Sequence, residues 1–391
     1  MRLNSLASLV FVLVVAGCSA LPGPQSRIGS ADLLDGHALF GETVSTDEAR
    51  DVDMLALSPA MNEFLRRNVR ETATDDTRMA QLLRAMKSAG YFDVAYDSNL
   101  TLTASETFER RTGNCLSYTS LFIALARGVR LDANFQLVDV PPIWDSVDDW
   151  VILNNHINSI VRGVGMRTKF AHDFIIDFNI ADYRGTFPRR QITDATAQAL
   201  FHSNRGVEAL RSGEMRIAFA NFKRALALHP RTPPAWVNLG ALYSRLADPE
   251  RAAAAYERAV AMQPSNKTAL TNLARLYDQV GDRDLAEQYR ARIRAYEDIN
   301  PYFHYSLARQ AYAAADYPRA LGQIKRAIAL KKDDDKLYFL QGLIYYRNGD
   351  FVAARASLER AQRFSEEPER YAEKLAVLAG HSTHTTQNNT E

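Results

Sequence analysis

Apolar residues at helical spacing mark the first folded region, which we place at residues 51–190. A Ser-Pro pair opens the stretch 58–69, and proline is favoured at the first position of a helix. Residues 75–89 form a second helical stretch. The run Thr-x-x-Glu at 103–106 is a capping box, which predicts a third helix directly after it.

A fourth helical stretch runs from Cys115 to Gly128. Its large apolar side chains recur at helical spacing, namely Tyr118, Leu121, Phe122 and Leu125. Gly128 is expected to be the C-cap. The pattern then changes to alternation, which predicts strands at residues 135–138, 151–161 and 174–180. Helices followed by strands predict an α+β domain with an antiparallel sheet.

From about residue 199 the sequence repeats. Five units start 34 residues apart, at 199, 233, 267, 301 and 335. Position 20 is always alanine, at Ala218, Ala252, Ala286, Ala320 and Ala354. Position 8 is always small, at Gly206, Gly240, Ala274, Ala308 and Gly342. Small residues at fixed helical positions let two helices approach closely, so the repetition has a packing cause.

The second unit carries the run Trp236-x-x-Leu239-Gly240-x-x-Tyr243, followed by Ala252, Tyr256, Ala259 and Pro264. This run resembles the tetratricopeptide consensus at nearly every defining position. The resemblance covers residues 199–366 and implies an all-α superhelix built from helix pairs. We expect residues 367–380 to cap the stack with a polar-faced helix and residues 381–391 to form a disordered tail.

The N-terminus has the pattern of an export signal over residues 1–17, with an apolar core that is too short to span a membrane. The run Val15-Ala16-Gly17-Cys18 resembles a bacterial lipobox. This resemblance implies that Cys18 becomes the acylated first residue of the mature chain. Ser19 resembles the outer-membrane sorting pattern. We therefore expect a lipid-anchored protein of the bacterial cell envelope, facing the periplasm.

Residues 18–50 are expected to form a flexible tether, because residues 19–45 are rich in Pro, Gly and Ser. The remaining composition, 47% hydrophobic and 24% charged, is that of a globular protein. Removal of the signal takes away one basic residue, Arg2, from the 47 Lys and Arg, which leaves 46 against 46 acidic residues. A neutral chain lacks the basic surface that nucleic-acid binding needs. The sequence contains no Walker-type loop, dinucleotide-binding turn, H-E-x-x-H or C-x-x-C, so we expect no cofactor and no metal.

Cys115 is the one cysteine left for chemistry once Cys18 is acylated. A free cysteine is most often a small buried apolar residue. In the first turn of a helix, however, a thiol faces unpaired backbone N–H groups and the positive end of the helix dipole. Both favour the thiolate, which is the nucleophile in cysteine enzymes. The position of Cys115 therefore predicts a catalytic role.

His156 and Asp177 lie on two successive predicted strands, joined by a turn that contains Gly163 and Gly165. If these strands pair antiparallel, two registers bring the side chains together. In one register His156 faces Asp177 directly, and in a register shifted by two the residues are diagonal neighbours on the same face. Either arrangement lets the aspartate orient the imidazole ring and stabilise the imidazolium.

Other histidines and acidic residues fit these roles less well. His172 and Asp173 are adjacent, so a strand places them on opposite faces. Three histidines fall in the repeats and are expected on helix surfaces or in packing, namely His202, His229 and His304. An acidic loop of Asp145, Asp148 and Asp149 is expected to be solvated. Trp144 and Trp150 flank this loop and either line a substrate cleft or belong to an aromatic core.

The order of Cys115 at a helix start, His156 on a strand and Asp177 on the next strand resembles the transglutaminase-like cysteine enzymes. The resemblance includes Gly113-x-Cys115 and its continuation Leu-Phe-Ile-Ala-Leu-Ala-Arg-Gly, and it spans about residues 75–182. It implies a papain-like α+β fold and a Cys-His-Asp triad. Such a triad attacks an amide or peptide carbonyl, and the thioester is then resolved by water or by an amine.

One residue departs from the family pattern, since Asn158 stands two positions after the histidine, where an aromatic residue is frequent. The alternative to an enzyme is a non-catalytic, protein-binding lipoprotein with a degenerate transglutaminase-like domain. In either case the repeats are expected to bind a protein or peptide.

The tetratricopeptide resemblance also implies a binding groove lined by positions 2, 5, 9, 12 and 13 of each unit. In the last three units these positions include Tyr302, Tyr305, Tyr312, Tyr346, Arg275, Arg309 and Arg347. Tyrosine and arginine are enriched at binding hot spots, which places the expected partner site in the C-terminal half of the stack. The alternative is that the tyrosines pack between helices.

Overall fold

The computed structural model describes residues 28–92, 95–138, 144–147, 150–153, 156–164, 172–178, 189–365, 368–369, 371–372 and 375. The expected signal, Cys18 and the tail 381–391 lie outside these residues. Among the described residues, no helix is long and apolar enough to cross a membrane.

The four helices expected in the first region are all present, and side-chain caps define their starts. They are α3 (Pro59–Asn68), α4 (Asp75–Ser88), α5 (Ala104–Arg110) and α6 (Cys115–Gly128). Ser58, Thr74, Thr103 and Asn114 each accept a hydrogen bond from a backbone N–H in the first turn of the helix that follows. Each cap satisfies one of the orphan donors of its helix.

Gly128 has a different role from the predicted one. It is the last residue of α6, and Val129 takes the C-cap position. A Cβ added at Gly128 would lie 2.6 Å from Leu65 and 2.9 Å from Leu57. The glycine therefore allows close packing of α6 against α3 and the segment before it, which spacing within one helix cannot reveal.

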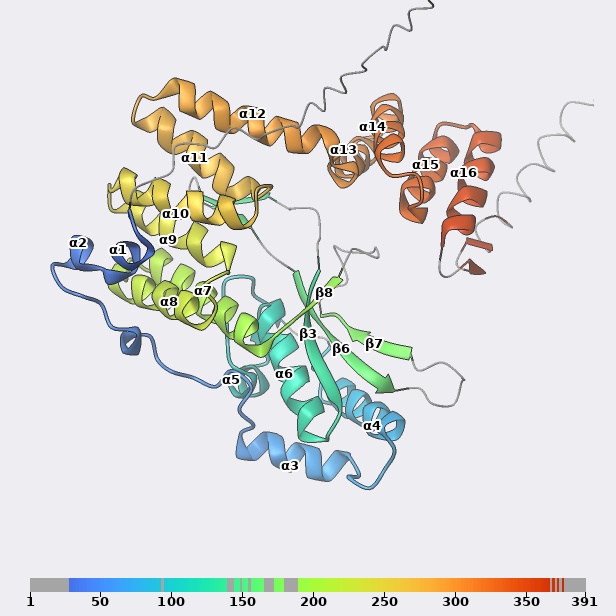
Figure 1. Ribbon diagram of the computed structural model, residues 1–391. Helices are drawn as coiled ribbons and strands as arrows, with labels where there is room; N and C mark the ends of the chain where they lie inside the picture. Colours follow the sequence, from blue (N-terminus) through green and yellow to red (C-terminus); the bar gives the residue numbers. More distant parts are fainter. Residues whose placement is uncertain are drawn as a thin grey trace, which may run out of the picture.

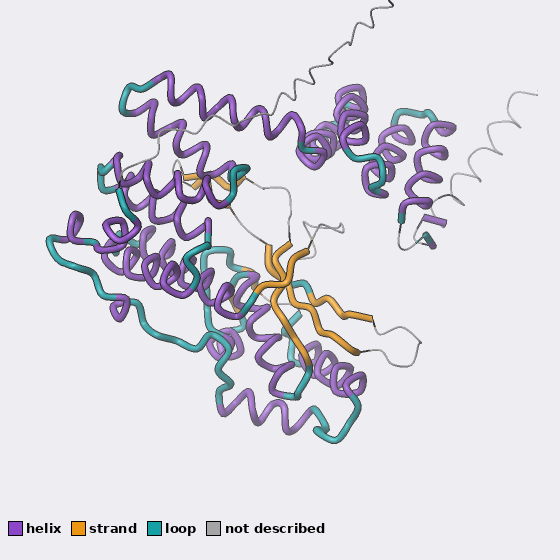
Figure 2. Tube along the Cα trace, viewed as in Figure 1, coloured by secondary structure: helices purple, strands orange, loops and turns teal. Residues whose placement is uncertain are grey.

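The sheet has four antiparallel strands in the order β7-β6-β3-β8. The strands are β3 (Asp132–Val138), β6 (His156–Val164), β7 (His172–Ile176) and β8 (Arg189–Ile192). Figure 2 shows them side by side, with α6 packed against β3 and β6. A short parallel pair, β1 (Ala95–Tyr96) with β2 (Thr112–Gly113), lies directly before α6.

The single strand predicted at 151–161 is two strands. β5 (Trp150–Leu153) pairs with β4 (Trp144–Val147) in a separate hairpin, and β6 starts afresh at His156. The strand break places His156 at the beginning of β6, where it can lie beside the start of α6.

Between β8 and Ser365 the structure describes ten helices, which form five antiparallel pairs (Figure 1). They are α7 (Asp194–Arg211), α8 (Met215–Leu228), α9 (Pro233–Arg245), α10 (Pro249–Met262), α11 (Lys267–Gln279), α12 (Arg283–Ile299), α13 (Pro301–Ala313), α14 (Tyr317–Leu330), α15 (Asp335–Arg347) and α16 (Phe351–Phe364). The first helix of the second to fifth pairs begins at 233, 267, 301 and 335, the later starts of the 34-residue period. In the first pair, α7 begins at Asp194, before the expected start at 199.

The small residues of the repeat lie where two helices of a pair meet. A Cβ on Gly206 would lie 2.4 Å from the Phe222 ring, and one on Gly240 would lie 2.7 Å from the Tyr256 ring. Gly342 lies against Leu358 in the same way. In each pair the large residue follows the glycine by sixteen positions (206 to 222, 240 to 256, 342 to 358), so glycine and large side chain interlock across the pair.

The repeats do not share one continuous core. One hydrophobic cluster joins α7 to α12 and ends near Tyr289. A second begins at Ala308 and joins α13, α14 and α15. Figure 1 shows α12 leading away from the first group toward α13–α16. Beyond α16, Tyr371 is buried and its hydroxyl donates to Asp335 at 2.6 Å, so this residue of the expected cap packs on the last pair.

The tether expected over residues 18–50 is folded from Ile28 onward. Two short helices, α1 (Ser30–Asp35) and α2 (His37–Phe40), and a 3₁₀ turn, η1 (Thr46–Glu48), lie against the repeats. Leu33 and Val44 are fully buried in the repeat core. Tyr243 donates to the Leu33 carbonyl at 2.8 Å, and Lys223 donates to the Val44 carbonyl at 2.6 Å. Local composition suggested a flexible chain, whereas non-local contacts satisfy its carbonyls and bury its apolar side chains.

Candidate functional site

Cys115 is the first residue of α6, and the preceding Asn114 caps the helix. The Asn114 Oδ1 accepts the backbone N–H of Ser117 at 3.0 Å. Cys115 is half-buried and carries a free thiol. The thiol thus lies at the positive end of the helix dipole, as the sequence predicted.

Gly113 is required where the chain enters α6. Its φ is +140°, and an added Cβ would lie 2.7 Å from the Ser117 Cβ. The backbone therefore passes the first turn at a distance that only glycine allows. This is the physical reason for the glycine two residues before the cysteine.

His156 and Asp177 are brought together by β6 and the end of β7. The His156 Nε2 lies 2.8 Å from each carboxylate oxygen of Asp177. His156 is buried and Asp177 is partly exposed. Because Nε2 faces the aspartate, Nδ1 is the ring nitrogen available to Cys115, with which the His156 side chain is also hydrogen-bonded.

Of the two registers considered for these strands, the structure has the shifted one. Ser159 pairs with Ile176, so the position opposite Asp177 is Asn158 and His156 is its diagonal neighbour. Alternation along the strands is compatible with both registers and cannot decide between them.

The environment of His156 favours the imidazolium. Burial alone lowers the pKa of His156, but hydrogen bonds to Asp177 and to Cys115, with the charges of both groups, raise it to about 9. The histidine is therefore protonated near neutral pH. An imidazolium beside a cysteine at a helix N-terminus is the electrostatic arrangement that stabilises a thiolate.

Two residues to which the sequence analysis gave no role in the site hold this arrangement in place. The Asn158 Nδ2 donates to the Asp177 Oδ2 at 3.1 Å, so the residue that departs from the family pattern orients the aspartate. The Thr119 hydroxyl donates to the Ile157 carbonyl at 3.3 Å and ties α6 to β6 beside His156. The spacing of two between His156 and Asn158 on one strand is the signal that points to a shared face.

The other candidates are not brought to this site. His202 contacts Asn221, His229 contacts Thr232, and His304 contacts Gln323, all within the repeats. Asp173 is exposed on β7. Trp144 and Asp145 belong to β4 and Trp150 to β5, while Asp148 and Asp149 lie outside the described residues.

The predicted partner-binding residues divide by exposure. Arg309 and Arg347 are exposed, and Arg347 is hydrogen-bonded to Tyr312. The tyrosines are half-buried, as is Arg275. The Tyr302 hydroxyl donates a hydrogen bond to Asp334 at 2.8 Å and accepts one from Lys331 at 2.9 Å. Tyr305 packs on the core of the last two units. The tyrosines therefore contribute to helix packing, and Arg309 and Arg347 are the exposed members of the set.

Comparisons with known proteins bear on the repeats. Profiles described as tetratricopeptide repeat match residues 233–276, 269–298 and 305–368. The C-terminal half of the chain carries tetratricopeptide repeats. Such repeats are typical of protein–protein interaction. No curated protein matches the chain.

Several solved structures match between 42% and 51% of this chain. One chain of the APC/C hetero-tetramer Cut9-Hcn1 is similar at 19% identity, over 47% of this chain and 37% of that chain, with a TM-score of 0.26. MamA from Desulfovibrio magneticus RS-1 is similar at 17% identity, over 46% of this chain and 97% of its own, with a TM-score of 0.25. YrrB, titled a TPR protein with an unusual peptide-binding site, is similar at 17% identity, over 48% and 92%, with a TM-score of 0.24.

The raised pKa of His156 predicts a pH-dependent contribution to stability. A raised pKa means that the protonated ring stabilises the fold fully below the ordinary value of about 6.5, and that this contribution is lost as the pH rises through about 9. The free energy of unfolding of the wild type should exceed that of His156→Gln most at pH 6, by an amount on the order of 2 kcal/mol. Scanning calorimetry from pH 6 to 10 measures this margin. In an Asp177→Asn background the margin should be smaller and flatter, and a margin independent of pH in the wild-type background would contradict the assignment.

Proposed function

We propose that this chain is a cell-envelope cysteine enzyme of the transglutaminase-like type, which hydrolyses amide or peptide bonds or transfers the acyl group. Cys115 is the nucleophile, His156 the general acid–base, and Asp177 the group that orients the histidine. The observation that carries this proposal is the His156 ring, held by Asp177 through Nε2 and hydrogen-bonded to Cys115 at the start of α6.

The chemistry follows from these positions. The Cys115 sulfur attacks the carbonyl carbon, and the C–N bond breaks as the His156 proton passes to the leaving amine. The Cys115 backbone N–H lies in the first turn of α6, where the helix supplies no acceptor, and it can bind the oxyanion. Water or a primary amine then attacks the thioester, gives up its proton to His156 and releases the thiolate.

A scaffold without activity is the competing proposal, favoured by the tetratricopeptide repeats. The two proposals differ in what they require of the site. An inactive domain has no need of a histidine that is buried, charged and shared between a carboxylate and a thiol, because burial of such groups opposes folding unless they are well paired.

Cys115 should react with iodoacetamide at pH 6.5 faster than an unperturbed thiol, and His156→Ala should slow that reaction by about tenfold or more, since the imidazolium is lost. His229→Ala, which changes a half-buried histidine in the repeats, serves as the matched control and should leave the rate unchanged. Mass spectrometry locates the label, and samples quenched at successive times give the rate of alkylation. Slow alkylation in the wild type that His156→Ala does not alter would favour the scaffold.

We also propose that Cys18 is acylated and anchors the protein to the outer membrane, facing the periplasm. The support is the lipobox-like run that ends at Cys18. Only residues 19–27 separate Cys18 from Ile28, where the chain already packs on the repeats. Ten residue steps span at most about 35 Å, so the anchor would hold the first two repeat pairs close to the lipid surface.

Substitution of Cys18→Ser should leave the protein unprocessed or move it from the membrane to the soluble fraction. Several acyl chains are needed for stable anchoring, because one gives only marginal binding. Fractionation of cells, followed by immunoblotting, distinguishes the two forms, and Cys115→Ser is the control that should remain membrane-bound. A wild-type protein found wholly in the soluble fraction would overturn the anchor.

We propose further that the last three units bind an extended peptide or protein segment through the arginines of the expected groove. Since Tyr305 packs in the core, Arg309 and Arg347 are the residues to test.

Arg309→Glu together with Arg347→Glu should reduce capture of partners from envelope extracts several-fold, because Arg supplies forked donors to carboxylates. Arg319→Glu changes an exposed arginine on the second helix of the fourth unit and is the control. Equal capture by all three proteins would count against the groove.

A further inference from the structure

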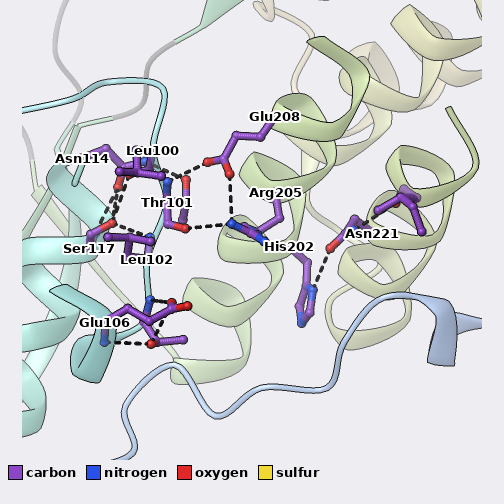
Figure 3. A network of polar contacts seen from close by, with 12 residues as sticks. Leu100, Thr101, Leu102, Glu106, Asn114, Ser117, His202, Arg205, Glu208 and Asn221 are labelled. Atoms are coloured by element: carbon purple, nitrogen blue, oxygen red, sulfur yellow. Dashed lines mark hydrogen bonds and ion pairs between the residues drawn. The ribbon is translucent and has the colours of Figure 1, made fainter. Parts of the chain in front are cut away.

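The first repeat helix reaches into the loop that precedes the Cys115 helix. Glu208 of α7 accepts the backbone N–H of Thr101 at 2.6 Å and pairs with Arg205 at 3.2 Å (Figure 3). Burial raises the pKa of the Glu208 carboxyl, while hydrogen bonds from the side chain and backbone of Thr101 oppose that rise. One carboxylate oxygen is thus directed at Thr101 of the loop and the other at Arg205 of the same helix.

Thr101 connects Glu208 to Asn114, the residue that caps α6. The Thr101 Oγ1 accepts the Nδ2 amide of Asn114 at 2.8 Å, and both side chains are buried. The same Asn114 accepts the Ser117 N–H through Oδ1, and its own backbone N–H donates to Leu100 at 2.9 Å. Both ends of the Asn114 amide are therefore engaged, which determines the direction in which the chain enters Cys115.

A second contact holds the loop to the same turn. The backbone N–H of Leu102 donates to the Ser117 Oγ at 2.9 Å. Figure 3 shows the loop clamped between α7 on one side and the first turn of α6 on the other. Removal of the Glu208 acceptor would leave the Thr101 N–H partly buried without its partner, so the loop would have to move to regain a hydrogen bond.

We infer that Glu208 is a positioning residue for Cys115, acting through Thr101 and Asn114, so that the first tetratricopeptide helix sets the geometry of the nucleophile. This inference rests on the proposed nucleophilic role of Cys115. It assigns to the repeats a second task besides partner binding, because a shift of α7 is transmitted to the cysteine by three side chains.

The test is the rate of Cys115 alkylation by iodoacetamide in the full chain at pH 6.5. Glu208→Ala should lower the second-order rate constant by about tenfold. Glu208→Gln keeps an acceptor for the Thr101 N–H and should restore the rate to within about twofold of the wild type. Thr101→Val keeps the backbone contact but breaks the link to Asn114, and it should be as slow as Glu208→Ala.

The matched control is Gln198→Ala. Gln198 also lies on α7 and donates to the N-terminal region, at the Val52 carbonyl (2.8 Å), but it has no link to Asn114. The control should alkylate at the wild-type rate. If it is slowed as much as Glu208→Ala, the effect belongs to the interface as a whole and the inference is wrong.

Two further outcomes separate this inference from the proposed function. A wild type that alkylates rapidly and in a His156-dependent way, with Glu208→Ala and Thr101→Val equally fast, overturns the positioning role alone. A wild type with an ordinary, His156-independent rate overturns the proposed function and the inference with it. If Glu208→Ala does not fold, Thr101→Val and Glu208→Gln carry the test.

Discussion

Burial of one helix in two hydrophobic cores is the constraint on which the rest of this structure depends. On α7, Ala197, Leu200 and Phe201 pack in the core formed by α3, α4, α6 and the sheet. Farther along the same helix, Ala209 and Leu210 pack in the core of the repeats. Neither core is complete without α7, so the α+β region and the first repeat pairs cannot be separated between residues 190 and 199 without exposing apolar surface.

This shared helix explains why the N-terminal segment and the cysteine loop take their places. The segment from Ile28 crosses α8, α9 and α10, where Arg258, Tyr243 and Lys223 donate to its carbonyls. From there the chain enters the α+β region beside α7. The N-terminal segment therefore packs on the repeats, which come later in the sequence. Only after this segment does the chain form the region that holds the cysteine.

Local chemistry in the sequence was enough to predict a large part of this arrangement. Side-chain caps, the capping box at Thr103 and the 34-residue period act within a few turns of chain, and the helices begin where those signals lie. The order of Cys115, His156 and Asp177 also pointed to three side chains that the structure brings together. The flexible tether was wrong for residues 28–50, as were the C-cap at Gly128 and the single strand at 151–161. Each depends on contacts between residues far apart in the chain, such as Gly128 with Leu65.

The candidate site shows the same division between local and distant causes. The helix start that favours a thiolate is local to Asn114 and Cys115, but the imidazolium depends on a strand register that only the folded sheet sets. The Asn114 cap also depends on a distant contact, because it is hydrogen-bonded to Thr101, which in turn is bound by Glu208 of α7. Because α7 can move only if both cores yield, the first repeat pair gives the Cys115 helix a rigid support.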